Sequence, residues 1–361
     1  MRAAPLLPSA AAIPFGNGPA SRVFRVRYEG PPRLLREYLC ERYRYGRSPD
    51  WERTFYPARV RLNEAPVDAD TRVAPGDVIA YLHLRGDEPP VAPPGPPLHA
   101  DPWLLALTKG DDAPVNPSGV HYFTALAIQA RETFANPELT PIHRLDLETS
   151  GPVLFATRNA HLPACHALFQ RRALGKRYRA LVHGRFPPDL LLIAGRIVPD
   201  PASRILTRLR LEPVTPDEAA EAAALADAAP SDTPRPMHSR NAPAQVSLTR
   251  IVSVTHHDLG PRGVFSELEL QPVTGKTNQL RVHLAHVGHP IVGDKKYHPD
   301  EAVFLDWHAH RDFARLADRL LLPRQALHCE ALDFPHPFTG EPVEIHAPAA
   351  MWAAKVAGLL G

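Results

Sequence analysis

Apolar residues recur at two spacings along the chain, and the two spacings predict helices and strands. Repeats of three to four residues predict helices at residues 34–43, 121–134, 161–174 and 276–287. Alternating or short apolar runs predict strands at 60–62, 78–81, 103–107, 153–156, 176–184, 245–254 and 263–270. In the strand at 176–184, the alternation places Tyr178, Ala180 and Val182 on one face. This pattern indicates an α+β protein and leaves the strand order open.

The composition changes along the chain in a way that predicts two domains. Residues 1–20 are small and apolar with no period, which is typical of a flexible tail. A small domain with a helix followed by strands is predicted at 21–86, and residues 87–100 form a Pro-rich, semi-rigid linker. The larger domain is predicted at 101–361. Within it, residues 212–244 are poor in bulky apolar residues, so we interpret them as a mobile insertion.

Positive charge is concentrated in two stretches, although the 361-residue chain carries a formal charge of only +2. Between Arg33 and Arg61 there are eight Arg and four acidic residues. From Arg171 to Arg185 there are six basic residues and no acid. Such clusters are typical of a protein that binds a phosphate backbone. A solvated surface would produce the same pattern, so the charge alone does not decide between the two interpretations.

Cysteine content and hydropathy favour a cytoplasmic protein. Cys40, Cys165 and Cys329 are odd in number and far apart, which fits neither a disulfide framework nor a zinc pattern. No uninterrupted apolar run reaches the roughly 18 residues that a membrane helix needs. The N-terminus also lacks the charged-then-apolar order of a signal peptide. We therefore expect a cytoplasmic protein without a membrane partner.

The polar run HRLDLETSG at residues 143–151 is the strongest candidate for a reacting site. It places the carboxylate of Asp146 close in sequence to His143 and Arg144. Pro and Gly bracket the run, and its Thr and Ser can bond to their own backbone, so the carboxylate has a fixed direction. The competing interpretation is a surface turn with a local ion pair, which contributes only ~0 to 1 kcal/mol to stability.

Two later segments add candidate site residues to this run. The predicted strand at 176–184 carries Tyr178 within a basic, alternating pattern. The predicted helix at 276–287 has an apolar face, and Asn278 and Arg281 are neighbours on another face because they lie three residues apart.

Together these segments resemble the RluA class of pseudouridine synthases. The class signature His-Arg-Leu-Asp-x-x-Thr-Ser-Gly is complete at 143–151, and residues 176–184 resemble the class strand Lys-x-Tyr-x-Ala-Leu-Val-x-Gly. The segment that starts at Gly275 resembles the class motif Gly-Arg-Thr-His-Gln-Ile-Arg-Val-His, with Lys276 replacing Arg and Asn278 replacing His. Lys109 is followed by Gly-Asp-Asp, where the class has Pro-x-Gly.

The resemblance implies a role for each matched residue. Asp146 would be the catalytic nucleophile, and Arg281 would pair with it. Tyr178 would stack on the target base and is a candidate proton acceptor. Arg144 would fill the gap that the extruded uridine leaves in the RNA. The other implied RNA contacts belong to His143, Lys176, Arg177, Lys276, Asn278 and Gln279.

The resemblance also implies a fold and a partner. The larger domain would be a mixed, mainly antiparallel β-sheet with flanking helices and a central cleft. Residues 21–86 look like a small S-four-like α+β RNA-binding domain. The implied partner is structured RNA, bound by a monomer with an affinity that weakens as salt rises. The S-four-like domain favours large-subunit ribosomal RNA, and transfer RNA is the alternative substrate.

The implied reaction moves the ribose bond from nitrogen 1 to carbon 5 of uracil. It involves no redox change and therefore needs no cofactor. It does need an ionised carboxylate and a group that manages protons. We expect the neighbouring Arg281 to keep Asp146 ionised at neutral pH.

Two readings of a different class compete with this one. The chain could be an RNA-binding protein without activity, although Asp146, Tyr178 and Arg281 are all present. It could also be a metal-dependent hydrolase, but no HExxH spacing is present. The candidate zinc ligands for that reading are His283, His286, His308 and His310 with Asp294 or Asp306.

Overall fold

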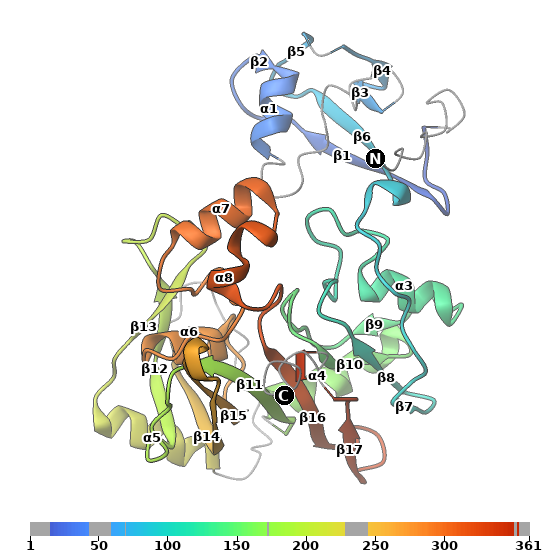
Figure 1. Cartoon of the computed structure of the whole chain (residues 1–361). Helices are drawn as coiled ribbons and strands as arrows, with labels where there is room; N and C mark the ends of the chain where they lie inside the picture. The colour runs from blue at the N-terminus through green and yellow to red at the C-terminus, as the bar shows by residue number, and fades with distance from the viewer. Residues whose placement is uncertain are drawn as a thin grey trace. The chain divides into compact units, whose positions relative to one another are not determined.

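The structure is a computed structural model that describes residues 15–42, 59–68, 70–171, 173–227, 245–349 and 352–353. The chain divides into two compact units (Figure 1). The first unit comprises residues 1–92 and 117–128, and the second comprises residues 93–116 and 129–361. The division near residue 92 falls inside the Pro-rich stretch, whereas residues 117–128, expected in the larger domain, group with the first unit.

The described residues of the first unit form helix α1, the 3-10 helix η2, the start of α3 (Leu126–Thr133) and two small antiparallel sheets. The larger sheet has the strand order β1-β6-β3-β4, and β2 pairs with β5. Helix α1 spans Leu35–Arg42, as the apolar spacing predicted, and Tyr43 lies outside the described residues. Leu35 and Leu39 of α1 belong to the buried core of this unit. The other elements are β1 (Ser21–Arg27), β2 (Arg33–Leu34), β3 (Val60–Leu62), β4 (Ala65–Pro66), β5 (Arg72–Val73), β6 (Val78–Leu84) and the 3-10 helix η2 (Arg85–Asp87).

The described residues of the second unit form two antiparallel sheets, whereas the resemblance implied a single, mixed and mainly antiparallel sheet. A four-stranded sheet has the order β7-β8-β10-β9, and a seven-stranded sheet has the order β13-β12-β14-β15-β11-β16-β17. The first sheet consists of β7 (His99–Ala100), β8 (Leu104–Lys109), β9 (Thr140–Pro141) and β10 (Gly151–Ala156). The second consists of β11 (Gly175–His183), β12 (Leu192–Pro199), β13 (Leu209–Glu212), β14 (Val246–Asp258), β15 (Val264–Pro272), β16 (Leu327–Pro335) and β17 (Pro342–His346).

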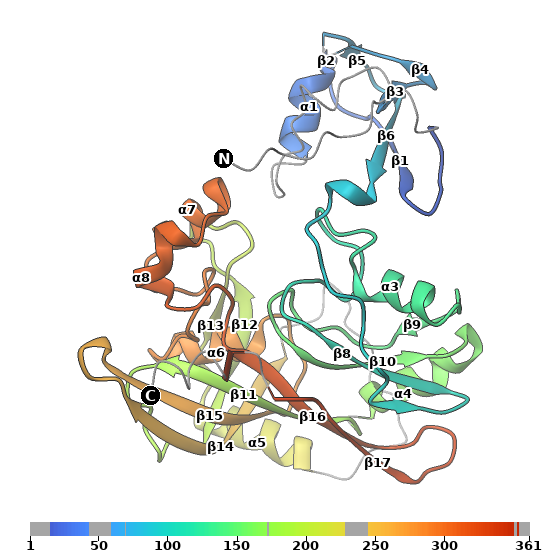
Figure 2. The same ribbon diagram turned by 45° about the vertical axis from the view of Figure 1, so that its right-hand side comes forward.

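Two helices of the second unit lie on opposite sides of the seven-stranded sheet (Figure 2). Helix α6 (Gln279–His286) packs against β14, and Nε2 of its His283 lies 2.9 Å from Oγ of Ser247 in that strand. Helix α5 (Pro216–Asp227) is joined to β12 by the ion pair between Arg196 and Glu218. The remaining helices are α3 (Leu126–Thr133), α4 (Leu162–Gln170), α7 (Ala302–His310), α8 (Ala317–Leu320), η3 (Asn159–His161), η4 (Gly260–Arg262) and η5 (Ala314–Leu316). Among the described residues, no helix is long and apolar enough to cross a membrane.

Part of the stretch that we expected to be a mobile insertion, 212–244, has regular secondary structure. Residue 212 ends β13, and Pro216–Asp227 forms α5, while residues 228–244 lie outside the described residues. Thr215 and Glu218 form a capping box: the Thr215 N–H donates to Oε2 of Glu218 at 2.9 Å, and the Glu218 N–H donates to Oγ1 of Thr215 at 3.2 Å. Pro216 suits the first helical position, and Ala dominates the rest. These local signals outweigh the low content of bulky apolar residues.

The two sheets of the second unit meet where the polar run ends. The N–H of Cys329 in β16 donates to the carbonyl of Ser150 at 2.8 Å. Gly151 follows with a φ of +131°, and a Cβ there would lie 2.3 Å from the carbonyl oxygen of Cys329. Only glycine allows this approach, so the Gly of the signature sets the distance between β10 and β16.

Candidate active site

A buried lysine holds the turn that carries Asp146 by hydrogen bonds to the backbone. Lys109 is 1% exposed, and its ammonium donates to the carbonyls of Gly110 at 2.7 Å and of Leu147 at 2.8 Å. Burial lowers the pKa of Lys109 to about 7, against the attraction of the nearby acids. Lys109 therefore anchors the backbone directly after Asp146, even though the residues that follow it depart from the class pattern.

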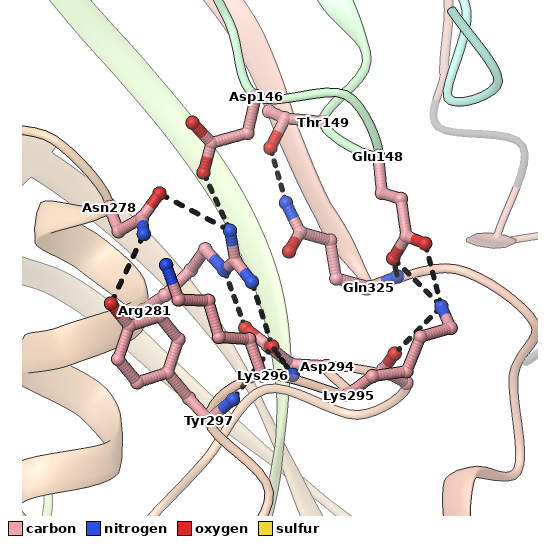
Figure 3. Close-up of polar contacts among 11 residues, drawn as sticks. Asp146, Glu148, Thr149, Asn278, Arg281, Asp294, Lys295, Lys296, Tyr297 and Gln325 are labelled. Carbon is pink, nitrogen blue, oxygen red and sulfur yellow. Dashed lines mark hydrogen bonds and ion pairs between the residues drawn. The ribbon is translucent and has the colours of Figure 1, made fainter. Parts of the chain in front are cut away.

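Arg281 links the Asp146 turn to α6. Its Nη1 donates to Oδ2 of Asp146 at 2.9 Å (Figure 3). Its Nε and Nη2 donate to the two carboxylate oxygens of Asp294 at 2.6 and 2.9 Å. The expected pairing of Arg281 with Asp146 is thus present, and Asp294 is a second carboxylate that the sequence patterns did not assign to Arg281.

Arg281 and Asp294 hold each other in their ionised forms. Burial acts against the charge of Arg281, but Asp294 and Asp146 outweigh it and raise the pKa of the guanidinium well above its usual value. Burial likewise acts against the charge of Asp294, but Arg281 and backbone N–H groups outweigh it and lower the pKa of the carboxyl group. Asp294 has a fully buried side chain, whereas that of Asp146 is 23% exposed. Asp146 is therefore the carboxylate that a ligand can reach.

Tyr178 lies on β11 at an irregularity of the sheet. The pairing of β11 with β16 shifts by one residue between Arg177 and Tyr178, and such a bulge redirects side chains. Burial and the neighbouring Cys329 thiol, to which the phenol is hydrogen-bonded, raise the pKa of Tyr178 well above its usual value, and Asp146 adds to the shift. The phenol is therefore protonated at neutral pH, which suits a stacking ring better than a resident proton acceptor.

The basic residues of β11 are largely used by the fold. Arg177 pairs with Glu344 at 2.7 Å, and Arg179 pairs with Glu267 at 3.2 Å and Glu330 at 3.0 Å. Two of the six basic residues at 171–185 are therefore paired with carboxylates that are distant in sequence. Lys176 lies 5.4 Å from the centroid of the Phe169 ring, and burial lowers its pKa.

Two of the expected RNA contacts, the half-buried His143 and the buried Gln279, have side chains that bond within the protein. Nε2 of His143 accepts the Leu154 N–H at 3.1 Å, and burial lowers the pKa of His143 well below its usual value, so the ring is neutral. Gln279 is 4% exposed; its amide nitrogen donates to the Leu248 carbonyl, and its oxygen accepts from Thr274 and Lys276. Hydrogen bonds within the protein therefore account for both side chains without an RNA contact.

The other expected RNA contacts differ in their surroundings. Arg144 is exposed, two residues before Asp146. Lys276 donates to the side chain of Gln245 at 3.2 Å. Asn278 precedes α6 with a left-handed backbone, φ 55°, a conformation that Asn tolerates better than most residues, and its side chain touches both Arg281 and Tyr297. The helix predicted from residue 276 therefore begins only at Gln279.

A second ion pair holds the same turn from another side. Nζ of Lys295 donates to both oxygens of Glu148 at 2.7 and 2.8 Å and to the Pro323 carbonyl at 2.7 Å (Figure 3). Gln325 donates to Oγ1 of Thr149 at 2.6 Å. The sequence patterns did not single out Lys295 or Gln325. Among the described residues, no group of three His, Cys, Asp or Glu could hold a metal ion.

Comparison with known proteins gives the same family for the sequence and for the fold. The model of the RNA pseudouridylate synthase family matches residues 104–286, which is just over half of the 361-residue chain. Ribosomal large subunit pseudouridine synthase C of Vibrio cholerae is 26% identical over 305 residues, which cover 80% of this chain and 81% of that protein. Dual-specificity RNA pseudouridine synthase RluA of Pasteurella multocida is 27% identical over 270 residues, which cover 73% of this chain and 96% of that protein. The solved structure of human RNA pseudouridylate synthase domain containing 1 is similar, with a TM-score of 0.50 and 25% identity over 73% of this chain and 86% of that chain.

Proposed function

The chain belongs to the RNA pseudouridylate synthase family, and on that premise we propose that it isomerises specific uridines of structured RNA to pseudouridine, with Asp146 as the nucleophile. The observation that carries the residue assignment is the Arg281 bridge. One guanidinium holds the buried Asp294 with two nitrogens and the accessible Asp146 with the third. A carboxylate that is oriented and reachable is what the reaction requires.

The contacts of Asp146 leave one of its oxygens for the substrate. Arg281 bonds to Oδ2, and no described residue is hydrogen-bonded to Oδ1. In the proposed reaction the bond between ribose C1′ and uracil N1 breaks, and the detached uracil turns over. A bond from C1′ to C5 then forms, and the proton on C5 leaves while N1 gains one. The atoms and electrons balance without an oxidant or a cofactor.

Tyr178 and Arg144 are proposed to hold the uridine and the RNA during this reaction. The ring of Tyr178 offers a stacking surface for the extruded base, and stacking is worth ~1 to 3 kcal/mol per base. Extrusion itself costs a few kcal/mol. Arg144 is exposed next to the Asp146 turn, and we assign it to the gap that the uridine leaves in the RNA.

We propose large-subunit ribosomal RNA as the substrate, and the Vibrio relative supports this choice because it matches most of both chains. A dual specificity for ribosomal and transfer RNA is the second candidate, because the Pasteurella relative carries that description.

We further propose that the first unit is an S-four-like RNA-binding domain, and its exposed Arg22 and Arg27 on β1 support this. Charge reversal at both arginines should weaken RNA binding and its salt dependence; an unchanged affinity would refute this role.

The deciding experiment maps pseudouridine by mass spectrometry in ribosomal and transfer RNA from cells with and without the gene. Cells that lack the gene are rescued by wild type or by Asp146→Asn. We expect one or a few sites to disappear and to return only with wild type. The RNA that carries these sites identifies the substrate. Rescue by Asp146→Asn would refute the nucleophile, and purified wild type without activity on either RNA would refute the function.

A further inference from the structure

A lysine beside the Arg281 cluster has no role in the function proposed so far. Lys296 follows Asp294 and Lys295, and its half-buried side chain points toward Asn278 (Figure 3). Its ammonium lies 3.2 Å from the Asn278 side-chain amide and 5.7 Å from the centroid of the Tyr297 ring. Among the described residues, no carboxylate lies within 4.0 Å of this ammonium, which distinguishes it from the neighbouring Lys295. Lys296 is thus a cation placed in the site without a direct ionic partner.

The charges around Asp146 explain why a second cation is useful there. Asp146 and Asp294 contribute two negative charges, and Arg281 contributes one positive charge. The three groups together carry a net charge of −1 in a largely desolvated setting. Lys296 brings this total to zero. An unbalanced negative charge would act against the negative charge that the leaving uracil develops and against the phosphates of the RNA.

The orientation of Asn278 supplies a direct connection between Lys296 and Asp146. The orientation drawn in Figure 3 places Oδ1 of Asn278 2.9 Å from Oδ2 of Asp146, so two acceptors would face each other. Amide orientation is assigned from hydrogen bonds. With the amide turned over, Asn278 donates to Asp146 at 2.9 Å, and its oxygen accepts from Lys296 Nζ at 3.2 Å and from the Tyr297 hydroxyl at 3.1 Å. The turned orientation satisfies both ends of the amide.

We propose that Lys296 is a positioning residue of the active site, which orients Asn278 toward Asp146 and supplies the second positive charge. This inference rests on the proposed function and names a residue outside the Asp146, Tyr178 and Arg281 set. The polar groups that surround the ammonium come from four parts of the chain. They are Asn278 and Arg281 at the start of α6, Asp146 in its turn, Asp294 and Tyr297 beside Lys296, and Arg208 before β13.

The proposal predicts a distinctive pH dependence. Burial and the nearby Arg281 lower the pKa of Lys296 to about 8, although Asp146 and Asp294 act in the opposite direction. Lys296 is charged below this pH and loses its charge as the pH rises through it. A rate that depends on the charge should therefore fall above about pH 8 in wild type. An arginine stays charged throughout this range, so Lys296→Arg should keep its rate at pH 9.

The test compares single-turnover pseudouridine formation from pH 6 to pH 9 at saturating RNA. Lys296→Met should lower the maximal rate by about 10- to 100-fold at pH 7, the range for loss of a hydrogen bond to a charged group, with a smaller change in KM. Lys296→Arg should restore most of the rate and remove the alkaline fall. Arg315→Gln is the matched control, because it removes an exposed cation paired with Asp306 in the same part of the chain.

A double-mutant cycle tests the path through Asn278. If Lys296 acts through the amide, Lys296→Met should have less effect in an Asn278→Ala background than in wild type. Fully additive effects would overturn this path. A Lys296→Met rate equal to that of the Arg315→Gln control, with the same pH profile as wild type, would overturn the proposal. Inactive wild type would instead refute the proposed function, so the two failures are distinguishable.

Discussion

Two ion-pair networks hold the same turn, and they differ in what they leave unpaired. In the network of Arg281, one oxygen of Asp146 is bonded and the carboxylate stays 23% exposed. In the network of Lys295, both oxygens of Glu148 are bonded and the glutamate side chain is 15% exposed. Asp146 and Glu148 are only two residues apart. The difference shows that alternate side chains of one turn have different surroundings: Asp146 is accessible to solvent, and Glu148 holds the turn.

The largest expected effect is on the network of Arg281, Asp146 and Asp294, which we call the open network. Asp146→Asn keeps the shape of the side chain and removes its charge, so pseudouridine formation should fall by at least about 10⁴-fold, as when a nucleophile is removed. RNA affinity should stay within about threefold of wild type, because Arg281 keeps its two bonds to Asp294. Single-turnover assays and filter binding measure the two quantities. Activity within tenfold of wild type would contradict the assignment of Asp146.

A smaller loss is expected when the bridge of the open network is altered. Arg281→Lys keeps the charge but cannot hold Asp294 with two nitrogens and Asp146 with a third. We expect the maximal rate to fall by about 100-fold, the order found when one preorganised donor is lost. The rate constant and the urea midpoint should be measured together. If Arg281→Lys behaved like wild type in both, the fork geometry would have no role in the reaction.

We call the network of Lys295 and Glu148 the closed network. Its disruption should affect the stability of the fold more than the rate of the reaction. Lys295→Met removes the nearest ionic partner of Glu148 and leaves it the Arg324 guanidinium at 3.6 Å, which should lower the free energy of unfolding by about 3 kcal/mol. The folded fraction should keep its rate within about tenfold. Urea unfolding and assays at low temperature separate the two effects. Lys295→Met combined with Glu148→Gln should recover part of the stability, and a pure loss of rate at full stability would remove the distinction between the networks.

The smallest expected effect concerns the hydroxyl of Tyr178. Its phenol is hydrogen-bonded to the Cys329 thiol and is protonated at neutral pH. Tyr178→Phe keeps the stacking surface, so the rate should fall by less than about tenfold, as for one neutral hydrogen bond. Single-turnover rates at pH 7 give the answer. A loss as large as that of Asp146→Asn would instead make the hydroxyl an essential proton carrier.

The sequence located the open network more fully than the closed one. Asp146 and Arg281 could be assigned from motif positions, and the structure places them 2.9 Å apart. Lys295 and Lys296 are adjacent and identical in type, so no pattern can tell that one is buried against Glu148 and the other faces Asn278. Only the path of the backbone between Gly293 and Tyr297 separates their roles.

Other differences between expectation and structure have local or long-range causes. Helix α5 is predictable from Thr215 and Glu218, which form a capping box at its start, although the composition of 212–244 favours an irregular segment. Gln279 reads as a polar surface residue, yet its buried amide joins β14 to α6. The pairing of Arg177 with Glu344 joins residues 167 positions apart, which single-sequence patterns do not reveal.

The seam between β10 and β16 also has a consequence for synthesis of the protein. Thr149 is held by Gln325, and Ser150 by His328, across 176 and 178 positions of sequence. The loop that carries Asp146 leaves the ribosome long before these partners do. Contacts of such long range form late and slowly, because the intervening chain must close first. A nascent chain therefore carries every residue of the HRLDLETSG run without these two supporting contacts until Gln325 and His328 have been made.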